Sequence, residues 1–308
     1  MILRTMWTAL VGVAALAPSG AWGELVVTEE VVAPSHDKRM EVTVSADGRH
    51  YAYISVDELQ QKAFVVHDGV EGPRLKQLQQ GMKFSADGTR FAYAGRLPEG
   101  GECYVIDGEV QGPYERADIK TLDFSADGKR LIYAVKAEGK WRLYLDGQPQ
   151  AAYDFIAGPA ILSPDGRHYT YSAKRGDKWV VVVDGDESPE YDGTAKGSPV
   201  MSPDGTRVAY HACLGDWEGG EHFVVVDAAA GPRYDGIGSL TFSPDGKRLA
   251  YRARRGEKWR AIVDGGEGPE FDGLGGLSFS PDGSRLAYWA RRGPKETGKE
   301  FAVVDGIE

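Results

Sequence analysis

Six histidines and a set of acidic residues are the side chains that could hold a metal ion or move protons in this chain. The histidines are His36, His50, His67, His168, His211 and His222. None belongs to a His-x-x-x-His or His-Glu-x-x-His pattern, which would direct two imidazoles at one ion. His50 and His168 occupy equivalent positions in two copies of a repeated unit, and the other copies carry Arg there. We therefore interpret both as surface residues and predict neither a metal site nor a cofactor.

Residues suited to nucleophilic or acid–base catalysis are few. The sequence lacks the Gly-x-Ser-x-Gly pattern that places a serine nucleophile on a sharp turn. Near the axis of the fold predicted below, the charged candidates are Lys83, Asp123 and Glu41. Nothing in their spacing brings two carboxylates together for acid–base work. We predict no catalytic residue and expect a protein that is not an enzyme.

Basic and aromatic residues interrupt the repeat in the loops between its second and third strands. Function in a repeat protein resides in such departures, because the repeat itself builds the scaffold. We predict a binding face made of Lys174, Arg175, Trp217, Arg254, Arg255, Arg291 and Arg292. Trp217 would be an aromatic anchor, and the cations would attract a protein or an anionic polymer. The alternative is that each arginine pairs with an Asp-Gly carboxylate of its own unit and is simply solvated.

One short motif, Ser-(Ala/Pro)-Asp-Gly, recurs along the chain and defines the repeated unit. Its seven copies are spaced 37 to 41 residues apart. Their aspartates are Asp47, Asp87, Asp127, Asp165, Asp204, Asp245 and Asp282. Seven units of this length nearly fill the chain after residue 23, so we predict a single repeat domain over residues 24–308.

The sixth copy shows most clearly what one unit contains. Residues 240–242 predict a first strand, and Ser-Pro-Asp-Gly at 243–246 predicts a tight turn, since Pro presets φ and Gly accepts a positive φ. Second and third strands are expected at 248–253 and 259–263, with a short fourth strand near 269–271. Four strands per unit in seven even units predict an all-β protein, a seven-bladed β-propeller with four antiparallel strands per blade.

The two ends of the repeat array fit a closed ring. The last copy stops after its third strand, at residues 303–308. A β-rich stretch at 25–32 precedes the first complete copy. We predict that this N-terminal strand completes and closes the last blade, which would remove a free sheet edge.

Other repeated residues are interpreted as structure. The turn aspartates lack the Asp-x-Asp-x-Asp-Gly spacing of calcium loops, so we expect them to stabilise turns. An Asp-Gly pair after the third strand predicts a hairpin turn in six copies, and the fifth copy has Asp227-Ala228 instead. We expect the tyrosine of each second strand to pack between blades and to bond a backbone group. These tyrosines are Tyr53, Tyr93, Tyr133, Tyr171, Tyr210, Tyr251 and Tyr288.

Two segments, 242–251 and 279–288, are similar to a known repeat. Each begins with Phe-Ser-Pro-Asp-Gly and ends with Leu-Ala-Tyr. They resemble the WD40-like repeat of the TolB family, also called the PD40 repeat. The resemblance extends over nearly the whole chain after residue 23 and implies a propeller fold. The TolB protein itself adds an N-terminal α/β domain and has six blades, so the resemblance does not imply its role in the envelope. The first three copies depart from the pattern by carrying Ala in place of Pro.

Residues 1–23 predict a secretory signal peptide. Arg4 gives a positive start, residues 6–16 are apolar, and small residues at 21 and 23 suit cleavage. The alternative is an uncleaved anchor, although the apolar run is shorter than a membrane span. No Cys stands at the predicted cut, so we expect a periplasmic or secreted protein without a lipid anchor. Cys103 and Cys213 are far apart in the sequence and are expected to be unpaired.

The net charge of −10 argues against a nucleic-acid binder, which needs a basic footprint. We expect an exported, non-catalytic platform, a monomer without a membrane span, that binds a protein or an anionic polymer of the cell envelope. A rigid disc would present its loops as one prearranged surface. The alternative is a propeller hydrolase or lyase that acts on carbohydrate.

Overall fold

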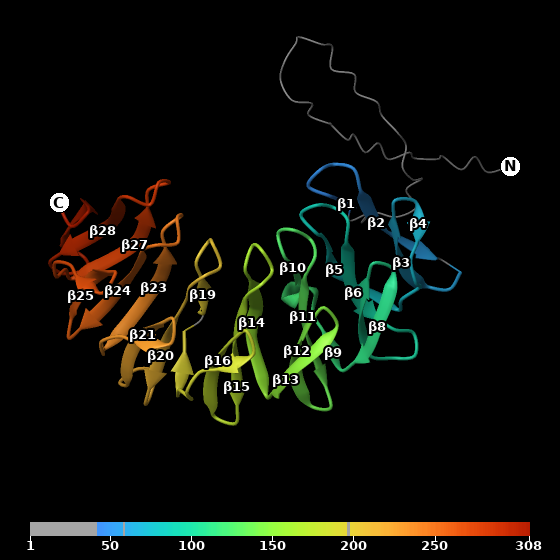
Figure 1. Ribbon diagram of the computed structural model, residues 1–308, viewed down its shortest axis with the longest axis horizontal. Coiled ribbons are helices and arrows are strands. Elements are labelled where there is room, and N and C mark those ends of the chain that lie inside the picture. Colours follow the sequence, from blue (N-terminus) through green and yellow to red (C-terminus); the bar gives the residue numbers. More distant parts are fainter. Residues whose placement is uncertain (1–41, 58, 196–197) are drawn as a thin grey trace, which may run out of the picture. The chain divides into compact units, whose positions relative to one another are not determined.

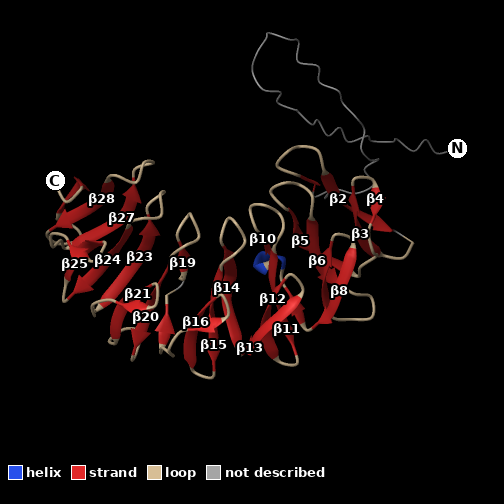
Figure 2. Ribbon diagram, in the orientation of Figure 1, coloured by secondary structure: helices blue, strands red, loops and turns tan. Residues whose placement is uncertain are grey.

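The computed structural model describes residues 42–57, 59–195 and 198–308. Within these residues the regular structure is β-sheet, apart from the single 3₁₀ turn η1 (Ile119–Thr121). The strands form seven small antiparallel sheets, and Figures 1 and 2 show these elements along the chain. The chain divides into two compact units after Pro113, and the units are described separately below.

The first unit contains two sheets whose strands are paired in chain order. Sheet one consists of β1 (Val42–Val44), β2 (Tyr51–Asp57), β3 (Lys62–His67) and β4 (Val70–Glu71). Sheet two consists of β5 (Gln77–Phe84), β6 (Phe91–Arg96), β7 (Glu102–Ile106) and β8 (Glu109–Tyr114). The faces of the two sheets pack together around Leu75, Phe91 and Cys103.

The second unit contains five sheets, and each lies beside the next in chain order (Figure 1). Sheet three has β9 (Arg116–Ala117), β10 (Asp123–Phe124), β11 (Leu131–Ala137), β12 (Lys140–Leu145) and β13 (Gln148–Tyr153). Sheet four has β14 (Phe155–Leu162), β15 (Tyr169–Arg175), β16 (Lys178–Val183) and β17 (Asp186–Glu187). Sheet five has β18 (Gly193–Thr194), β19 (Val200–Met201), β20 (Val208–Leu214), β21 (Glu221–Val226) and β22 (Ala229–Ala230).

The last two sheets repeat the same order. Sheet six has β23 (Gly236–Phe242), β24 (Leu249–Arg255), β25 (Lys258–Val263) and β26 (Gly266–Glu267). Sheet seven has β27 (Gly273–Phe279), β28 (Leu286–Arg292) and β29 (Lys299–Val304). Of the described residues, none forms a helix long and apolar enough to cross a bilayer.

The predicted fold class, an all-β protein of seven antiparallel blades, is confirmed. In sheets three and five the first strand is split into two pieces, so that five strands occupy four positions. Sheet seven has three described strands, as expected from a last copy that ends early. The strand predicted at 25–32 to close this blade lies outside the described residues, as does the predicted signal peptide.

The Ser-x-Asp-Gly motif forms the turn between the first two strands of every sheet. In sheet four the Ser163 hydroxyl donates to Asp165 Oδ1 at 2.7 Å, and that oxygen also accepts the Arg167 amide at 3.1 Å. Gly166 follows with a positive φ of 68°. The same serine hydroxyl bond lowers the pKa of the turn aspartate in all seven copies. The carboxylate is therefore occupied with its own turn, as predicted.

The Asp-Gly pair forms a two-residue turn after the third strand. Asp264 and Gly265 have φ of 51° and 84°, which is the double positive φ of a type I′ hairpin. The carboxylate also ties this turn to the start of the second strand, since Asp264 Oδ1 accepts the Leu249 amide at 2.8 Å. Blade five keeps the geometry with Ala228 at φ 67°, although an alanine is strained there.

Repeat tyrosines pack between consecutive sheets within each unit, as predicted, at Tyr93, Tyr171, Tyr210, Tyr251 and Tyr288. The rings of sheets two to seven are 1 to 4% exposed, and Tyr53 of sheet one is half-buried. The expectation that every hydroxyl bonds a backbone group does not hold, because the Tyr210 hydroxyl is hydrogen-bonded to the Tyr191 hydroxyl at 3.2 Å. The two cysteines are buried and unpaired, also as predicted.

The Ala228 strain gives the first testable prediction. Replacing Ala228 with Gly removes the strain of the left-handed conformation, although glycine also gives the unfolded chain more conformational entropy. Because the relief of strain is the larger effect, the free energy of unfolding should rise by roughly 0.5–1 kcal/mol. The matched control is Gly265→Ala, whose added methyl group meets no atom within 4 Å. That variant should lose roughly 1 kcal/mol through backbone strain alone. Urea unfolding measures both changes, and a destabilised Ala228→Gly variant would contradict this explanation.

Candidate functional site

The hairpins between second and third strands share one end of the sheets in the second unit. An aspartate from the loop before each sheet fixes the hairpin by accepting a glycine amide. Asp154 accepts from Gly176 at 2.8 Å, and Asp272 accepts from Gly293 at 2.7 Å. Asp192 and Asp235 make the same bond to their own hairpins. These four loops and hairpins therefore lie on one face, which we call the hairpin face.

Three of the predicted binding arginines are held by carboxylates on this face. Arg175 donates to both oxygens of Glu187, at 3.0 and 2.6 Å, and its guanidinium lies over the Tyr153 ring. Arg255 pairs with Glu267 and lies over Tyr234. Arg292 pairs with Glu308 in the same manner. The alternative is that each arginine pairs with the carboxylate of an Asp-Gly turn. It is wrong for these three arginines, because each pairs with a glutamate that follows the Asp-Gly turn.

The other three predicted cations are not paired with carboxylates among the described residues. Arg254 donates to the Asp235 carbonyl at 2.9 Å, and Arg291 donates to the Gly293 carbonyl at 2.6 Å. Lys174 lies near the Trp179 ring, 5.9 Å from its centroid. These residues occupy one equivalent position in three sheets. None of the three therefore forms an ion pair with a carboxylate among the described residues, although Arg291 also donates to the Asp272 carbonyl and, after Lys258, helps to lower the pKa of Asp272.

Trp217 lies in the long β20–β21 hairpin and is 49% exposed. Its backbone carbonyl accepts from His222 Nε2 at 2.9 Å, and its ring centroid lies 5.1 Å from that of His211. His222 must therefore carry its proton on Nε2, which leaves Nδ1 to accept from His211 Nε2 at 2.8 Å. A buried pair of hydrogen-bonded histidines thus holds the loop that presents Trp217.

Burial, with a smaller contribution from the nearby His222, lowers the pKa of His211 to about 4. The side chain is 2% exposed, and Cys213 of the same strand is fully buried beside it. Sequence analysis did not connect these two histidines, since they are eleven residues apart. In the register of β20 and β21, His211 faces Val224 and His222 faces Cys213, so the two histidines are diagonal neighbours in one hairpin.

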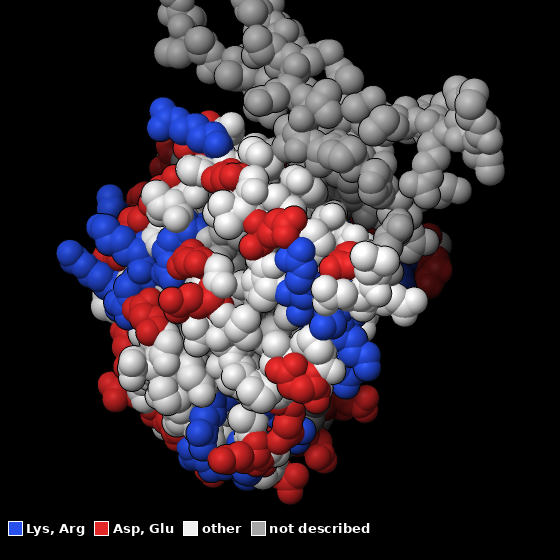
Figure 3. All heavy atoms as spheres, turned by 90° about the vertical axis from the view of Figure 1, so that its right-hand side faces the viewer, with Lys and Arg blue, Asp and Glu red and all other residues white. Residues whose placement is uncertain are grey.

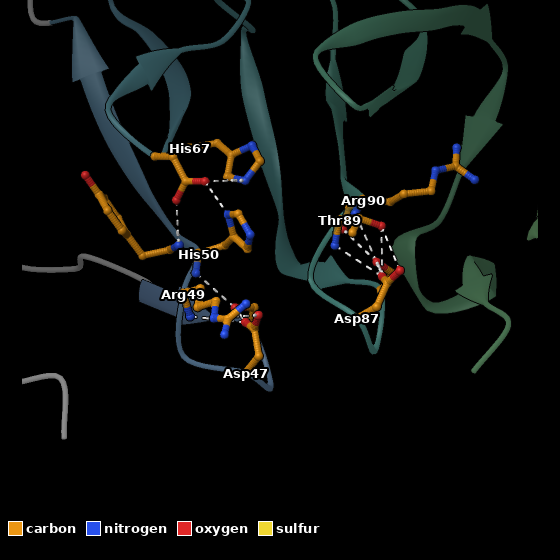
Figure 4. A network of polar contacts seen from close by, with 11 residues as sticks. Asp47, Arg49, His50, His67, Asp87, Thr89 and Arg90 are labelled. Atoms are coloured by element: carbon orange, nitrogen blue, oxygen red, sulfur yellow. Dashed lines mark hydrogen bonds and ion pairs between the residues drawn. The ribbon is translucent and has the colours of Figure 1, made fainter. Parts of the chain in front are cut away.

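The first unit brings together three residues that sequence analysis did not group. His50 Nδ1 lies 2.6 Å from Asp68 Oδ2, and His67 Nε2 lies 3.5 Å from the same oxygen (Figure 4). The hydrogen bond to Asp68 raises the pKa of His50. Burial alone would raise the pKa of Asp68, but the bonds from His50 and the Tyr51 amide outweigh it and lower that pKa. His67 could have been recognised from the sequence as a departure from the repeat, because the other six copies have an aliphatic residue at its position.

Three grooves of similar size lie between consecutive sheets of the second unit. Their volumes are about 440, 450 and 390 Å³. Each is lined by an Asp-Gly or Asp-Ala turn and by one repeat tyrosine, namely Tyr210, Tyr251 or Tyr288. Because the grooves recur with the repeat, we assign them to blade packing. The face shown in Figure 3 carries acidic and basic side chains interleaved with one another.

Neither a family model nor a curated protein matches the sequence. Similar solved structures include the β-propeller domain of the Trilobed protease from Pyrococcus furiosus, at 13% identity and a TM-score of 0.38, covering 86% of this chain and 95% of that one. TolB from Acinetobacter baumannii is 14% identical with a TM-score of 0.35, covering 83% of this chain and 66% of that one. Pyrococcus horikoshii acylaminoacyl peptidase is 12% identical with a TM-score of 0.36, covering 84% and 50%. We draw no functional conclusion from likenesses at this level.

The buried histidine pair predicts a specific pH dependence. Unfolded His211 gains a proton below about pH 6.5, whereas the folded side chain stays neutral to about pH 4. Stability should therefore fall by about 3 kcal/mol as the pH decreases through this window. His211→Gln keeps a donor for His222 and removes the titration. Urea unfolding at several pH values should show a shallower decline in the variant, and equal declines would contradict the assignment.

Proposed function

We propose that the protein is an exported, non-catalytic binding platform whose hairpin face recognises a partner protein or an anionic polymer of the cell envelope. The observation that carries this proposal is the half-exposed Trp217 on a loop held by two buried histidines. A large apolar side chain held at the surface by a buried polar network is a poor choice for stability alone. Such an arrangement suits an anchor residue that is preorganised for binding, because little conformational freedom is then lost when the partner binds.

The cations around this anchor support an anionic partner. Lys174, Arg254 and Arg291 lie at equivalent positions of three sheets, and none of them forms an ion pair with a carboxylate among the described residues. Backbone carbonyls hold the two guanidinium groups in place, so little side-chain freedom is lost when an anion binds. The paired arginines Arg175, Arg255 and Arg292 would form the polar rim of such a surface.

The place of action and the oligomeric state are part of this proposal. Export to the periplasm or beyond depends on the signal-like pattern of residues 1–23, which lie outside the described residues. The net charge of −10 fits a partner that meets a local basic surface rather than a polyanion wrapped around the whole molecule. We propose a monomer, and chromatography with light scattering would measure its mass.

A triple variant tests the hairpin face. Changing Trp217→Ser, Arg254→Gln and Arg291→Gln together should reduce binding at least about thirtyfold, since anchor residues each contribute about 2 kcal/mol. The measurements are capture of partners from an envelope extract and co-sedimentation with a polyuronide. A matched control changes Arg167→Gln and Lys247→Gln, two highly exposed cations on the Ser-x-Asp-Gly turns at the other end of the sheets.

The results separate three cases. Loss of binding in the triple variant but not in the control supports the hairpin face. Equal binding by both variants contradicts it. Shortening of the polyuronide by the wild-type protein would replace the proposal with the alternative of a hydrolase or lyase. Thermal unfolding of each variant checks that the fold is retained.

A further inference from the structure

The start of β2 and the end of β3 in sheet one hold a cluster that is independent of the hairpin face. His50 precedes β2, His67 ends β3, and Asp68 begins the turn that follows (Figure 4). One oxygen of Asp68 lies 2.6 Å from His50 Nδ1 and 3.5 Å from His67 Nε2. The three ligand atoms lie within 4.8 Å of one another. The cluster therefore brings three possible metal-ligand atoms close together, although not yet to the donor spacing around a bound ion.

The repeat shows which of these residues the fold requires. An aspartate at the position of Asp68 occurs in every copy and serves the hairpin turn. The position of His50 is Arg in five copies and His168 in the fourth. The position of His67 is aliphatic in all six other copies, which have Ile106, Leu145, Val183, Val226, Val263 and Val304. A blade therefore folds without a histidine at this place, and His67 needs another explanation.

The environment of His67 makes it a poor substitute for an aliphatic residue. Its ring packs against Phe84 and Phe91, at centroid distances of 5.4 and 4.7 Å. Its Nε2 is buried and makes no hydrogen bond among the described residues, and Asp68 Oδ2 lies 3.5 Å from it. A valine there would satisfy the same packing without leaving a polar atom unpaired. The unpaired nitrogen points to a ligand that would occupy it.

The distances fit a small divalent ion. Ligand atoms of tetrahedral zinc lie about 2.0–2.2 Å from the metal, and thus about 3.4 Å from one another. The 3.5 Å between His67 Nε2 and Asp68 Oδ2 already matches this spacing. The pair formed by His50 and Asp68 would open by about 0.8 Å when the ion replaces the proton between them. All three side chains are about one-third exposed, so solvent can reach a fourth position.

We propose that His50, His67 and Asp68 bind one divalent transition metal ion of the zinc type, with water in the fourth position. Two imidazole nitrogens and one carboxylate suit zinc, nickel or copper, whereas calcium and magnesium prefer oxygen ligands alone. The ion would link the start of β2 to the end of β3 and give His67 Nε2 a partner. This site lies at the opposite end of its sheet from the β2–β3 hairpin and does not depend on the proposed function.

Blade four provides an internal comparison for the test. His168 Nδ1 lies 2.7 Å from Asp184 Oδ2, which repeats the pair formed by His50 and Asp68. The position of His67 is occupied there by Val183, so the third ligand is missing. His67→Val therefore converts the site of blade one into that of blade four. Because valine is the natural residue in four other copies, we expect this variant to fold.

The experiment uses the full chain after treatment with a chelator. Titration calorimetry with zinc chloride should show one ion bound per chain, with at least about a hundredfold weaker affinity in His67→Val, which loses a direct ligand. The control variant His168→Arg should bind like the wild type. Zinc should raise the melting temperature of the wild type and of the control, but not that of His67→Val.

Cobalt provides a second reading of the same site. Bound cobalt in a tetrahedral site gives visible ligand-field bands, and these should disappear in His67→Val while the far-ultraviolet circular dichroism stays unchanged. Absence of saturable binding in the wild type would overturn the proposal. Equal zinc affinity in the wild type and in His67→Val would also overturn it, because the ion would then be held elsewhere, for example at the other histidines.

Discussion

One carboxylate, repeated seven times, holds each sheet of this protein together. The aspartate after the third strand accepts the first amide of the second strand with Oδ1, as Asp107 does from Phe91 at 2.9 Å. Its other oxygen binds the cation that precedes this strand, as Asp107 does with Arg90. Asp146, Asp227, Asp264 and Asp305 do the same with an arginine, and Asp68 and Asp184 do so with His50 and His168. A turn, a strand end and the side chain before that strand are thus fixed by one aspartate.

This constraint explains why much of the fold could be predicted from the sequence. Both turns of a blade depend on local chemistry, namely a serine and aspartate pair in one case and two residues of positive φ in the other. Such signals lie within a few residues of one another, so they are visible in a single copy and repeated in seven. The strands between them follow from the turns. The division of the chain after Pro113 carries no comparable local signal.

The candidate sites could be predicted only in part, because their contacts join residues that are distant in the sequence. The basic residues of the hairpin face were located by their departure from the repeat, but Glu187 as the partner of Arg175 was not. The link between His211 and His222 depends on strand register. His67 could have been found by comparing copies position by position, since it is a histidine in a column of aliphatic residues. A motif search misses it because no fixed spacing relates it to His50.

The two inferred sites depend on the scaffold in opposite ways. On the hairpin face, the aspartates that accept glycine amides fix the backbone, and variation in the hairpins supplies the binding residues. In sheet one, the hairpin aspartate itself becomes a ligand, because the scaffold already holds its carboxylate beside the residue at position 50. Relative to the copies with Arg at the position of His50, two changes, to His50 and to His67, then place two imidazole nitrogens beside one carboxylate oxygen. A repeat that positions a carboxylate in every blade therefore needs few changes to acquire a metal site, and each unchanged blade shows that the fold does not depend on it.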